Sequence, residues 1–153
     1  MALEFNTIGV KLNYATEATA GTRPTSGYTQ LKGIKSIPGM DFAPSQLDVT
    51  DLEDEVRRYI PGVIDAGNDI AVTANMTAAL KAAWESAVSA YETAREAGKS
   101  VWFEVAIPNF DSFYFAGIPV KQGLPDIGVD AVLETTLHII PNEITGWATA
   151  STT

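Results

Sequence analysis

The sequence contains no cysteine among its 153 residues. This absence excludes disulfides, thiolate nucleophiles and zinc sites built from cysteine. Basic residues are also scarce, with 10 Lys and Arg against 19 Asp and Glu, and the formal net charge is −9. The only adjacent basic pair is Arg57-Arg58. Because a nucleic-acid-binding face needs clustered Lys and Arg, the composition argues against such a face.

The chain also lacks any stretch close to the roughly 18 to 20 apolar residues that span a bilayer. Its first residues do not combine a basic region with an apolar run, so no signal peptide is expected. We therefore expect a soluble protein that is made in the cytoplasm. Hydrophobic residues make up 46% of the chain, enough for a core, while charged residues make up only 19%. A surface that is poor in charge is typical of proteins with partners.

Catalytic signatures are missing as well. The single histidine, His138, lies inside a predicted strand without a nucleophile motif, and is interpreted as a sheet-surface residue. No glycine-rich phosphate loop opens a helix. The densest acidic cluster lacks the alternating oxygen ligands and fixed glycine of a calcium loop. Its members are Asp48, Asp51, Glu53, Asp54 and Glu55. The sequence therefore predicts no enzyme and no catalytic, cofactor-binding or metal site.

Apolar periodicity predicts one helix over residues 78–97. Its apolar stripe consists of Leu80, Trp84, Val88, Tyr91 and Ala94, which recur at helical spacing. Thr77 is the expected N-cap and Gly98 the expected stop. Alternating patterns predict strands over residues 8–14, 28–37, 69–76, 101–107, 112–120 and 127–140. Residues 15–27 and 40–67 are predicted loops, and residues 141–153 a mobile tail.

One helix cannot cover both faces of a sheet of this size. The predicted fold is therefore mainly β (α+β): an antiparallel β-sandwich or small barrel flanked by the helix. The absence of repeats and linkers predicts a single domain over residues 1–153, with a flexible N-terminus. Aromatic residues crowd two predicted strands, and core packing is favoured over a sugar- or base-stacking surface. They are Trp102, Phe103, Phe110, Phe113, Tyr114 and Phe115.

The segment from Leu47 to Gly67 reads LDVTDLEDEVRRYIPGVIDAG. It resembles the signature T-x-L-x-D…R-x-Y-I-P-G-L-x-D-x-G of siphophage major tail tube proteins. The matching residues are Thr50, Leu52, Asp54, Arg58, Tyr59, Ile60, Pro61, Gly62, Asp65 and Gly67. Val63 replaces the commoner leucine. Chain length, element order and the polar C-terminal tail extend the resemblance over nearly the whole sequence.

The resemblance implies a β-sandwich with one helix, whose copies form hexameric rings that stack into a hollow tube for DNA delivery. It further implies a place in the virion tail after assembly in the host cytoplasm. The implied partners are further copies of the chain, a tape-measure protein, a tail terminator and baseplate hub proteins. DNA would pass without specific binding, which suits a negatively charged lumen. No cofactor and no membrane contact are implied.

In that family, the loop after the second strand reaches neighbouring subunits or rings. The implied inter-subunit residues are Leu47, Asp51, Leu52, Glu53, Glu55, Arg57, Arg58, Tyr59, Ile60, Pro61 and Gly62. Charge pairing between copies is expected around Arg57 and Arg58, with Tyr59 and Ile60 as apolar anchors. Candidates for facing the lumen are Glu104, Asp130 and Glu134. The alternatives are a related secretion tube, contractile-tail tube or tail terminator, a carbohydrate- or host-binding β module, and a small hydrolase.

Overall fold

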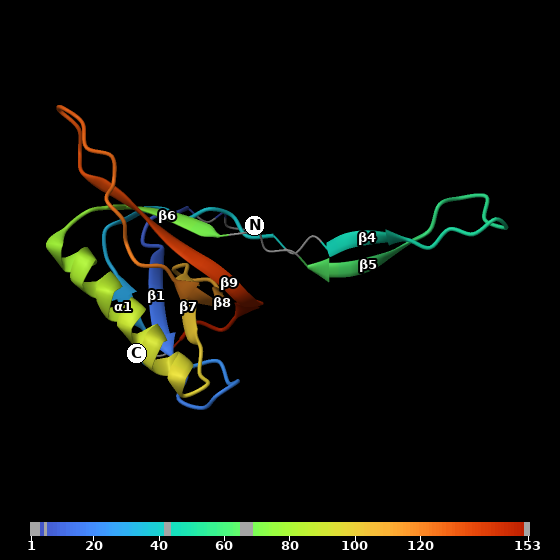
Figure 1. The fold of residues 1–153 in the computed structure, drawn as a ribbon, viewed down its shortest axis with the longest axis horizontal. Helices are drawn as coiled ribbons and strands as arrows, with labels where there is room; N and C mark the ends of the chain where they lie inside the picture. Colours follow the sequence, from blue (N-terminus) through green and yellow to red (C-terminus); the bar gives the residue numbers. More distant parts are fainter. Residues whose placement is uncertain (1–3, 5, 42–43, 65–68, 152–153) are drawn as a thin grey trace.

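The computed structural model describes residues 4, 6–41, 44–64 and 69–151. These residues form a seven-stranded antiparallel sheet, a two-stranded hairpin and one helix (Figure 1). The strands of the large sheet, in the order β2-β1-β7-β8-β9-β6-β3, have the following bounds. They are β1 (Lys11–Thr16), β2 (Thr29–Leu31), β3 (Ile34–Ser36), β6 (Ile70–Asn75), β7 (Val101–Ala106), β8 (Ser112–Pro119) and β9 (Glu134–Ala148). The predicted mainly β fold is thus confirmed.

The two edge strands of this sheet, β2 and β3, are consecutive in the chain and separated only by Lys32 and Gly33. Because a chain spans at most about 3.6 Å per residue, Leu31 and Ile34 lie within about 11 Å of each other. The opposite edges of the sheet therefore meet, and the sheet curls into a nearly closed barrel. Gly33 has φ +86°, and its carbonyl accepts a hydrogen bond from the Asn75 amide at 2.9 Å. Of the two architectures left open by the sequence, the structure shows the barrel.

Helix α1 (Ala78–Glu96) packs along one side of the barrel (Figure 1). It begins as predicted, because the Thr77 hydroxyl accepts a hydrogen bond from the Leu80 amide at 3.1 Å. It ends before Gly98, which has φ +72° and suits the reversal of the chain. Trp84 is fully buried, and its indole N–H donates to the Val120 carbonyl at 2.8 Å. Helix and barrel thus share one apolar core.

The aromatic residues of β7 and β8 are divided between the two faces of the sheet. Phe103 and Phe115 stack inside the barrel core, with ring centroids 5.4 Å apart. Trp102 and Tyr114 point to the other face, where they form a second buried cluster with Ala116. Phe113 is also buried in the barrel core. Core packing is therefore confirmed for the buried aromatic residues. Phe110 is exposed.

The predicted last strand is wrong at both ends. Strand β9 begins at Glu134 rather than at residue 127, and it continues to Ala148 rather than ending at Ile140. Residues 141–148, which the sequence predicts as tail, pair with β8, so that Ser112 lies opposite Ala148. The polar end of β9 remains a strand because β8 supplies hydrogen-bonding partners along its length. The predicted strand over residues 28–37 is likewise divided into β2 and β3.

The predicted loop over residues 40–67 is also corrected. It contains a β-hairpin made of β4 (Pro44–Asp48) and β5 (Tyr59–Ile64). Figure 1 shows this hairpin extending away from the barrel. Asp65 and Gly67 of the motif lie outside the described residues.

Candidate functional site: the projecting hairpin

The hairpin has two distinguishable faces. Leu47 lies opposite Ile60, and Asp48 lies opposite Tyr59. Because directly opposite residues in an antiparallel pair project to the same side, Leu47 and Ile60 share one face. Tyr59 lies on the other. Among the described strands, β4 and β5 pair only with each other, so neither face is covered by the barrel sheet.

Apolar side chains along the hairpin are exposed to an unusual degree. Leu52, at the tip, is 105% exposed, and Ile60 is 48% exposed. The other large apolar residues in this group are Leu47, Val49, Val56, Tyr59 and Val63. Clustered exposed apolar residues mark sites that contact another protein or a ligand. The motif segment around Thr50 to Gly62 thus falls on a hairpin that projects away from the barrel (Figure 1).

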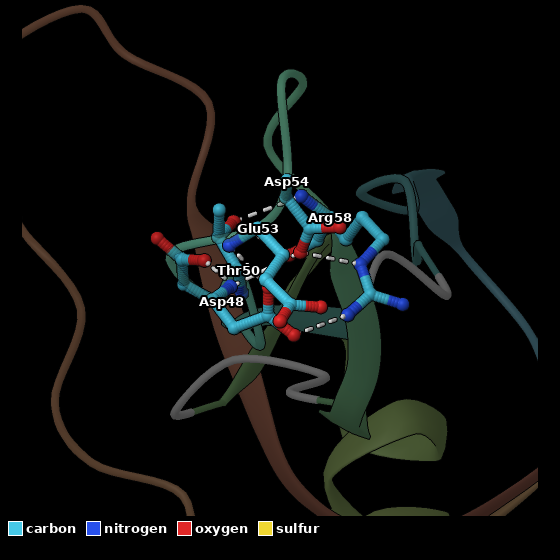
Figure 2. A network of polar contacts seen from close by, with 6 residues as sticks. Asp48, Thr50, Glu53, Asp54 and Arg58 are labelled. Carbon is cyan, nitrogen blue, oxygen red and sulfur yellow. Dashed lines mark hydrogen bonds and ion pairs between the residues drawn. The ribbon is translucent and has the colours of Figure 1, made fainter.

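The tip is ordered by hydrogen bonds between its own residues (Figure 2). The Thr50 hydroxyl accepts a hydrogen bond from the Arg58 amide at 2.9 Å, and the Val49 amide donates to the Arg58 carbonyl at 3.0 Å. The Asp51 amide donates to the Asp54 carboxylate at 3.0 Å, while the Glu53 amide donates to the Asp51 carboxylate at 2.9 Å. Carboxylates that accept from nearby amides stabilise turns of this kind. The motif residues therefore shape the tip.

Arg58 is the centre of the charged cluster. Its Nε donates to the Asp54 carboxylate at 2.8 Å, and a terminal nitrogen lies 3.4 Å from the Asp51 carboxylate (Figure 2). Arg57 is less engaged, with one ion pair to Asp48 at 3.5 Å. The expectation of charge pairing between copies is thus modified, since three of these acids already pair within the chain. Contact with other copies at this cluster stays a prediction.

Asp48 connects the strand to the tip. Hydrogen bonds from the Thr50 hydroxyl and amide lower the pKa of the Asp48 carboxyl, and the amide bond is 2.9 Å long. Hydrogen bonds of this type favour the charged form of the acid. Asp48 is therefore held ionised as part of the tip structure.

Gly62 lies where the two hairpin strands pack closely against each other. A Cβ added at this position would lie 2.3 Å from Ser45 Oγ and 3.2 Å from the Ser45 carbonyl oxygen. Neighbouring Pro61 lies opposite Gln46 beside a register shift in β4. Proline is tolerated at strand edges and irregularities but not in central strands. The Pro61-Gly62 pair thus lies within strand β5.

The three lumen candidates lie in different environments. Glu104 is only 1% exposed, so the expectation that it lines a lumen is wrong. Asp130 lies in the exposed segment before β9 and has φ +57°. Glu134, at the start of β9, forms an ion pair with Lys35. Asp130 and Glu134 are therefore accessible, whereas Glu104 is a structural residue.

Glu104 anchors a buried network that sequence reasoning did not find. Its carboxylate accepts hydrogen bonds from Asn13 Nδ2, the Tyr114 hydroxyl and the amide and hydroxyl of Ser151, at 2.8 to 2.9 Å. Burial alone would raise the pKa of Glu104, but these hydrogen bonds together lower it. The Arg23 guanidinium covers the Tyr114 ring at 4.1 Å. The network fastens the C-terminal residues to the outer face of the barrel.

Glu17 forms a second buried site of the same kind. It accepts hydrogen bonds from the Trp102 indole at 2.7 Å and from the Gly21 and Ser100 amides. Desolvation would raise the pKa of Glu17, but these hydrogen bonds lower it overall. For Glu104 the only sequence signal is an acid next to the aromatic residues Trp102 and Phe103, whereas Glu17 lies among small and polar residues and carries no such signal. Both carboxylates are satisfied by structural partners and neither is positioned for chemistry.

The remaining chemical candidates can be placed directly. His138 is exposed on β9 and pairs with Asp69, as expected for a sheet-surface histidine. Among the described residues, no three His, Asp or Glu side chains form a group that could hold a metal ion. No helix in the described part of the chain is long and apolar enough to cross a membrane.

No protein-family model and no curated protein sequence matches the chain. Solved structures with a similar fold were found, however. A chain of the anti-feeding prophage baseplate, from a 6-fold symmetrised cryo-EM structure, aligns with TM-score 0.62 at 12% identity, covering 95% of this chain and 97% of that one. A chain from the tail of an empty gene transfer agent particle with C6 symmetry aligns with a TM-score of 0.57 at 16% identity. The alignment covers 95% of this chain and 100% of that one.

A chain from the virion of a native gene transfer agent particle aligns with a TM-score of 0.58 at 14% identity. This alignment also covers 95% of this chain and 100% of the other. The chain therefore shares its fold, over nearly its whole length, with components of tail-type particles.

Proposed function

We propose that this chain is a structural subunit of a bacteriophage-type tail tube. It self-assembles into stacked hexameric rings that form a hollow conduit for DNA delivery, and it has no catalytic role. The observation that carries the proposal is the hairpin, which leaves the barrel and exposes apolar residues on both faces. A projecting element of this kind gains stability when a second copy covers it.

The fold likeness supports this role. The similar chains come from a baseplate and from gene transfer agent particles, and two of these structures have sixfold (C6) symmetry. The net charge of −9 suits a conduit whose wall must not retain DNA. Asp130 and Glu134 remain the lumen candidates. A tape-measure protein, a tail terminator and baseplate hub proteins are the proposed partners, and the virion tail is the proposed location.

The hairpin residues divide into two proposed roles. Leu47, Leu52, Tyr59, Ile60 and Pro61 supply apolar contact with a neighbouring copy. Asp51, Glu53, Glu55 and Arg57 form a polar rim, while Arg58 and Gly62 hold the hairpin in shape. Apolar anchors surrounded by polar residues are the usual anatomy of a protein interface.

The test uses two isoleucines on strand surfaces with similar exposure. Ile60 is 48% exposed on the hairpin, and Ile140 is 41% exposed on β9. Concentrated wild-type protein should form tubes in negative-stain microscopy and sediment as polymer. Ile60→Ser should raise the concentration needed for tubes about tenfold, because an apolar anchor is lost. Ile140→Ser should assemble like the wild type. Normal tubes from Ile60→Ser would refute the hairpin role, and a monomeric wild type at all concentrations would refute the tube.

A ring-forming component of a related tube or baseplate is the second candidate, favoured by the likeness to the anti-feeding prophage baseplate chain. Isolated rings that never stack in the same micrographs would support it over a tube subunit. The carbohydrate-binding alternative loses its basis, because most of the aromatic residues that suggested it are buried.

A further inference from the structure

A second apolar segment projects from the barrel between β8 and β9. We name residues 124–133 the apolar arm; it lies in the orange loop that leaves the barrel on the side away from the hairpin (Figure 1). Val129 is 98% exposed. Leu124, Ile127, Val132 and Leu133 are also exposed. Residues 127–133 alternate like a strand, yet they form none in the structure. This apolar pattern is therefore unused within the chain.

An apolar pocket of about 680 Å³ opens between the segment after β3 and the strands β7, β8 and β9. We name it the mouth pocket; its apolar lining includes Val10, Ile37, Met40, Ile107, Phe113 and Trp147. Lys35 is the only charged residue among the described residues that line it. A pocket of this size and polarity fits several aliphatic side chains.

The arm does not fill the pocket of its own chain. It joins the start of β9, whereas Trp147 lies at the far end of this strand of 15 residues. None of the residues 124–133 lines the pocket, although Lys35, which does, forms an ion pair with Glu134 at the base of the arm. Figure 1 shows the arm directed away from the barrel. An occupant with the arm's chemistry must therefore come from another molecule.

The number of charged residues in each segment indicates that the apolar arm, rather than the hairpin, occupies the mouth pocket. The hairpin tip carries seven charged residues between positions 48 and 58, while residues 122–133 carry only Asp126 and Asp130. Because buried charges are costly to desolvate, the pocket fits the arm better. Five aliphatic side chains give less than the roughly 800 Å² per partner of a stable dimer. The contact thus suits an assembly in which many copies repeat it.

We propose that the apolar arm of one copy docks into the mouth pocket of a second copy. The contact is heterologous, because different surfaces of the two copies meet, and it extends from copy to copy. It rests on the self-assembly set out under the proposed function and adds a contact that is separate from the hairpin. Val129 and Val132 enter the pocket, and Asp126 and Asp130 remain at its rim.

The absence of native cysteine allows the contact to be trapped by disulfides. Val129→Cys protein is mixed with Ser36→Cys protein, since Ser36 lines the pocket and is exposed. Thr7→Cys offers a second exposed pocket position. Ser89→Cys, on the exposed face of α1, is the control partner. The mixtures are assembled, oxidised mildly and separated on a non-reducing gel. A disulfide forms only when the two Cα atoms approach within about 7 Å.

We expect the Val129→Cys mixtures with either pocket variant to give heterodimer at least about tenfold above the Ser89→Cys mixture. Tubes without this excess would overturn the docking and leave the proposed function intact. Excess heterodimer without tubes would support the docking and count against the tube. A sample with neither tubes nor excess heterodimer would overturn both proposals.

Discussion

Removing Arg58 should loosen the hairpin tip without destabilising the barrel. Arg58→Ala loses the 2.8 Å pair with Asp54 and the 3.4 Å pair with Asp51. Exposed ion pairs contribute about 0.2 to 1 kcal/mol each, and the Asp54 side chain is only 21% exposed, which favours the upper end. We therefore expect a loss of about 1 to 2 kcal/mol in the ordering of the tip. This corresponds to a roughly 5- to 30-fold increase in its open population.

Arg57→Ala is the matched control, because it removes the same charge from the adjacent residue. Arg57 has one ion pair, at 3.5 Å, and both partners are well exposed, so its loss should have little effect on the tip. Hydrogen exchange at the Asp51 and Asp54 amides should accelerate about 5- to 30-fold in Arg58→Ala and less than about twofold in Arg57→Ala. Urea midpoints of both variants should match the wild type.

Assembly completes the test. If the tip must be preformed to bind a neighbour, Arg58→Ala should raise the concentration needed for tubes by the same factor by which it lowers the preformed population, and Arg57→Ala should not. Equal effects of both variants would mean that charge alone matters and would refute the structural role of Arg58. Unfolding of the whole chain by Arg58→Ala would instead show that the hairpin belongs to the core.

Three further changes have defined outcomes. Glu104→Gln should cost about 2 to 3 kcal/mol in urea unfolding at pH 7, because it loses charge-assisted hydrogen bonds. Since the pKa of Glu104 is lowered in the folded state, the stability difference between wild type and Glu104→Gln should be complete above about pH 5 and shrink as the pH falls through the lowered pKa. A stability difference that does not change with pH would contradict the role of the ionised Glu104 carboxylate. Gly62→Ala should impair assembly through the clash with Ser45 and be partly rescued by Ser45→Gly, with urea midpoints unchanged. Gly117→Ala, whose Cβ would lie 2.6 Å from Ile139, should instead lower barrel stability by about 1 to 3 kcal/mol.

Local signals in the sequence were sufficient for the helix and for the strands around it. Thr77 and Gly98 bracket α1 as expected, and alternation placed β6, β7 and β8 to within a residue or two. The helix and β6 bury one regular stripe or face, so their periodicity reports directly on the core. Strands β7 and β8 are marked instead by apolar and aromatic residues that are buried on both faces. The closure of the sheet depends instead on β2 and β3 lying at opposite edges, which no local pattern specifies.

The hairpin was not predicted as a hairpin, for a physical reason. Neither face of β4 is buried, so no alternation between apolar and polar residues marks it. Pro44 and Pro61 further suppress a strand prediction, although an isolated two-stranded ribbon tolerates proline. The motif located the projecting segment through resemblance, but the pairing of Arg58 with Asp54 and Asp51 depends on the folded tip. Glu104 was misplaced because its partners come from distant parts of the chain.

The error at β9 shows what alternation does and does not establish. The pattern runs from Ile127 to Ile139, but only residues with β6 or β8 beside them form a strand. Alternation therefore identifies a surface suited to being covered without specifying what covers it. The hairpin and the apolar arm both carry exposed apolar residues outside the barrel. Because neither contributes to the buried core, substitutions there should alter assembly and barrel stability separately, whereas substitutions at Trp84 or Phe103 should affect stability first.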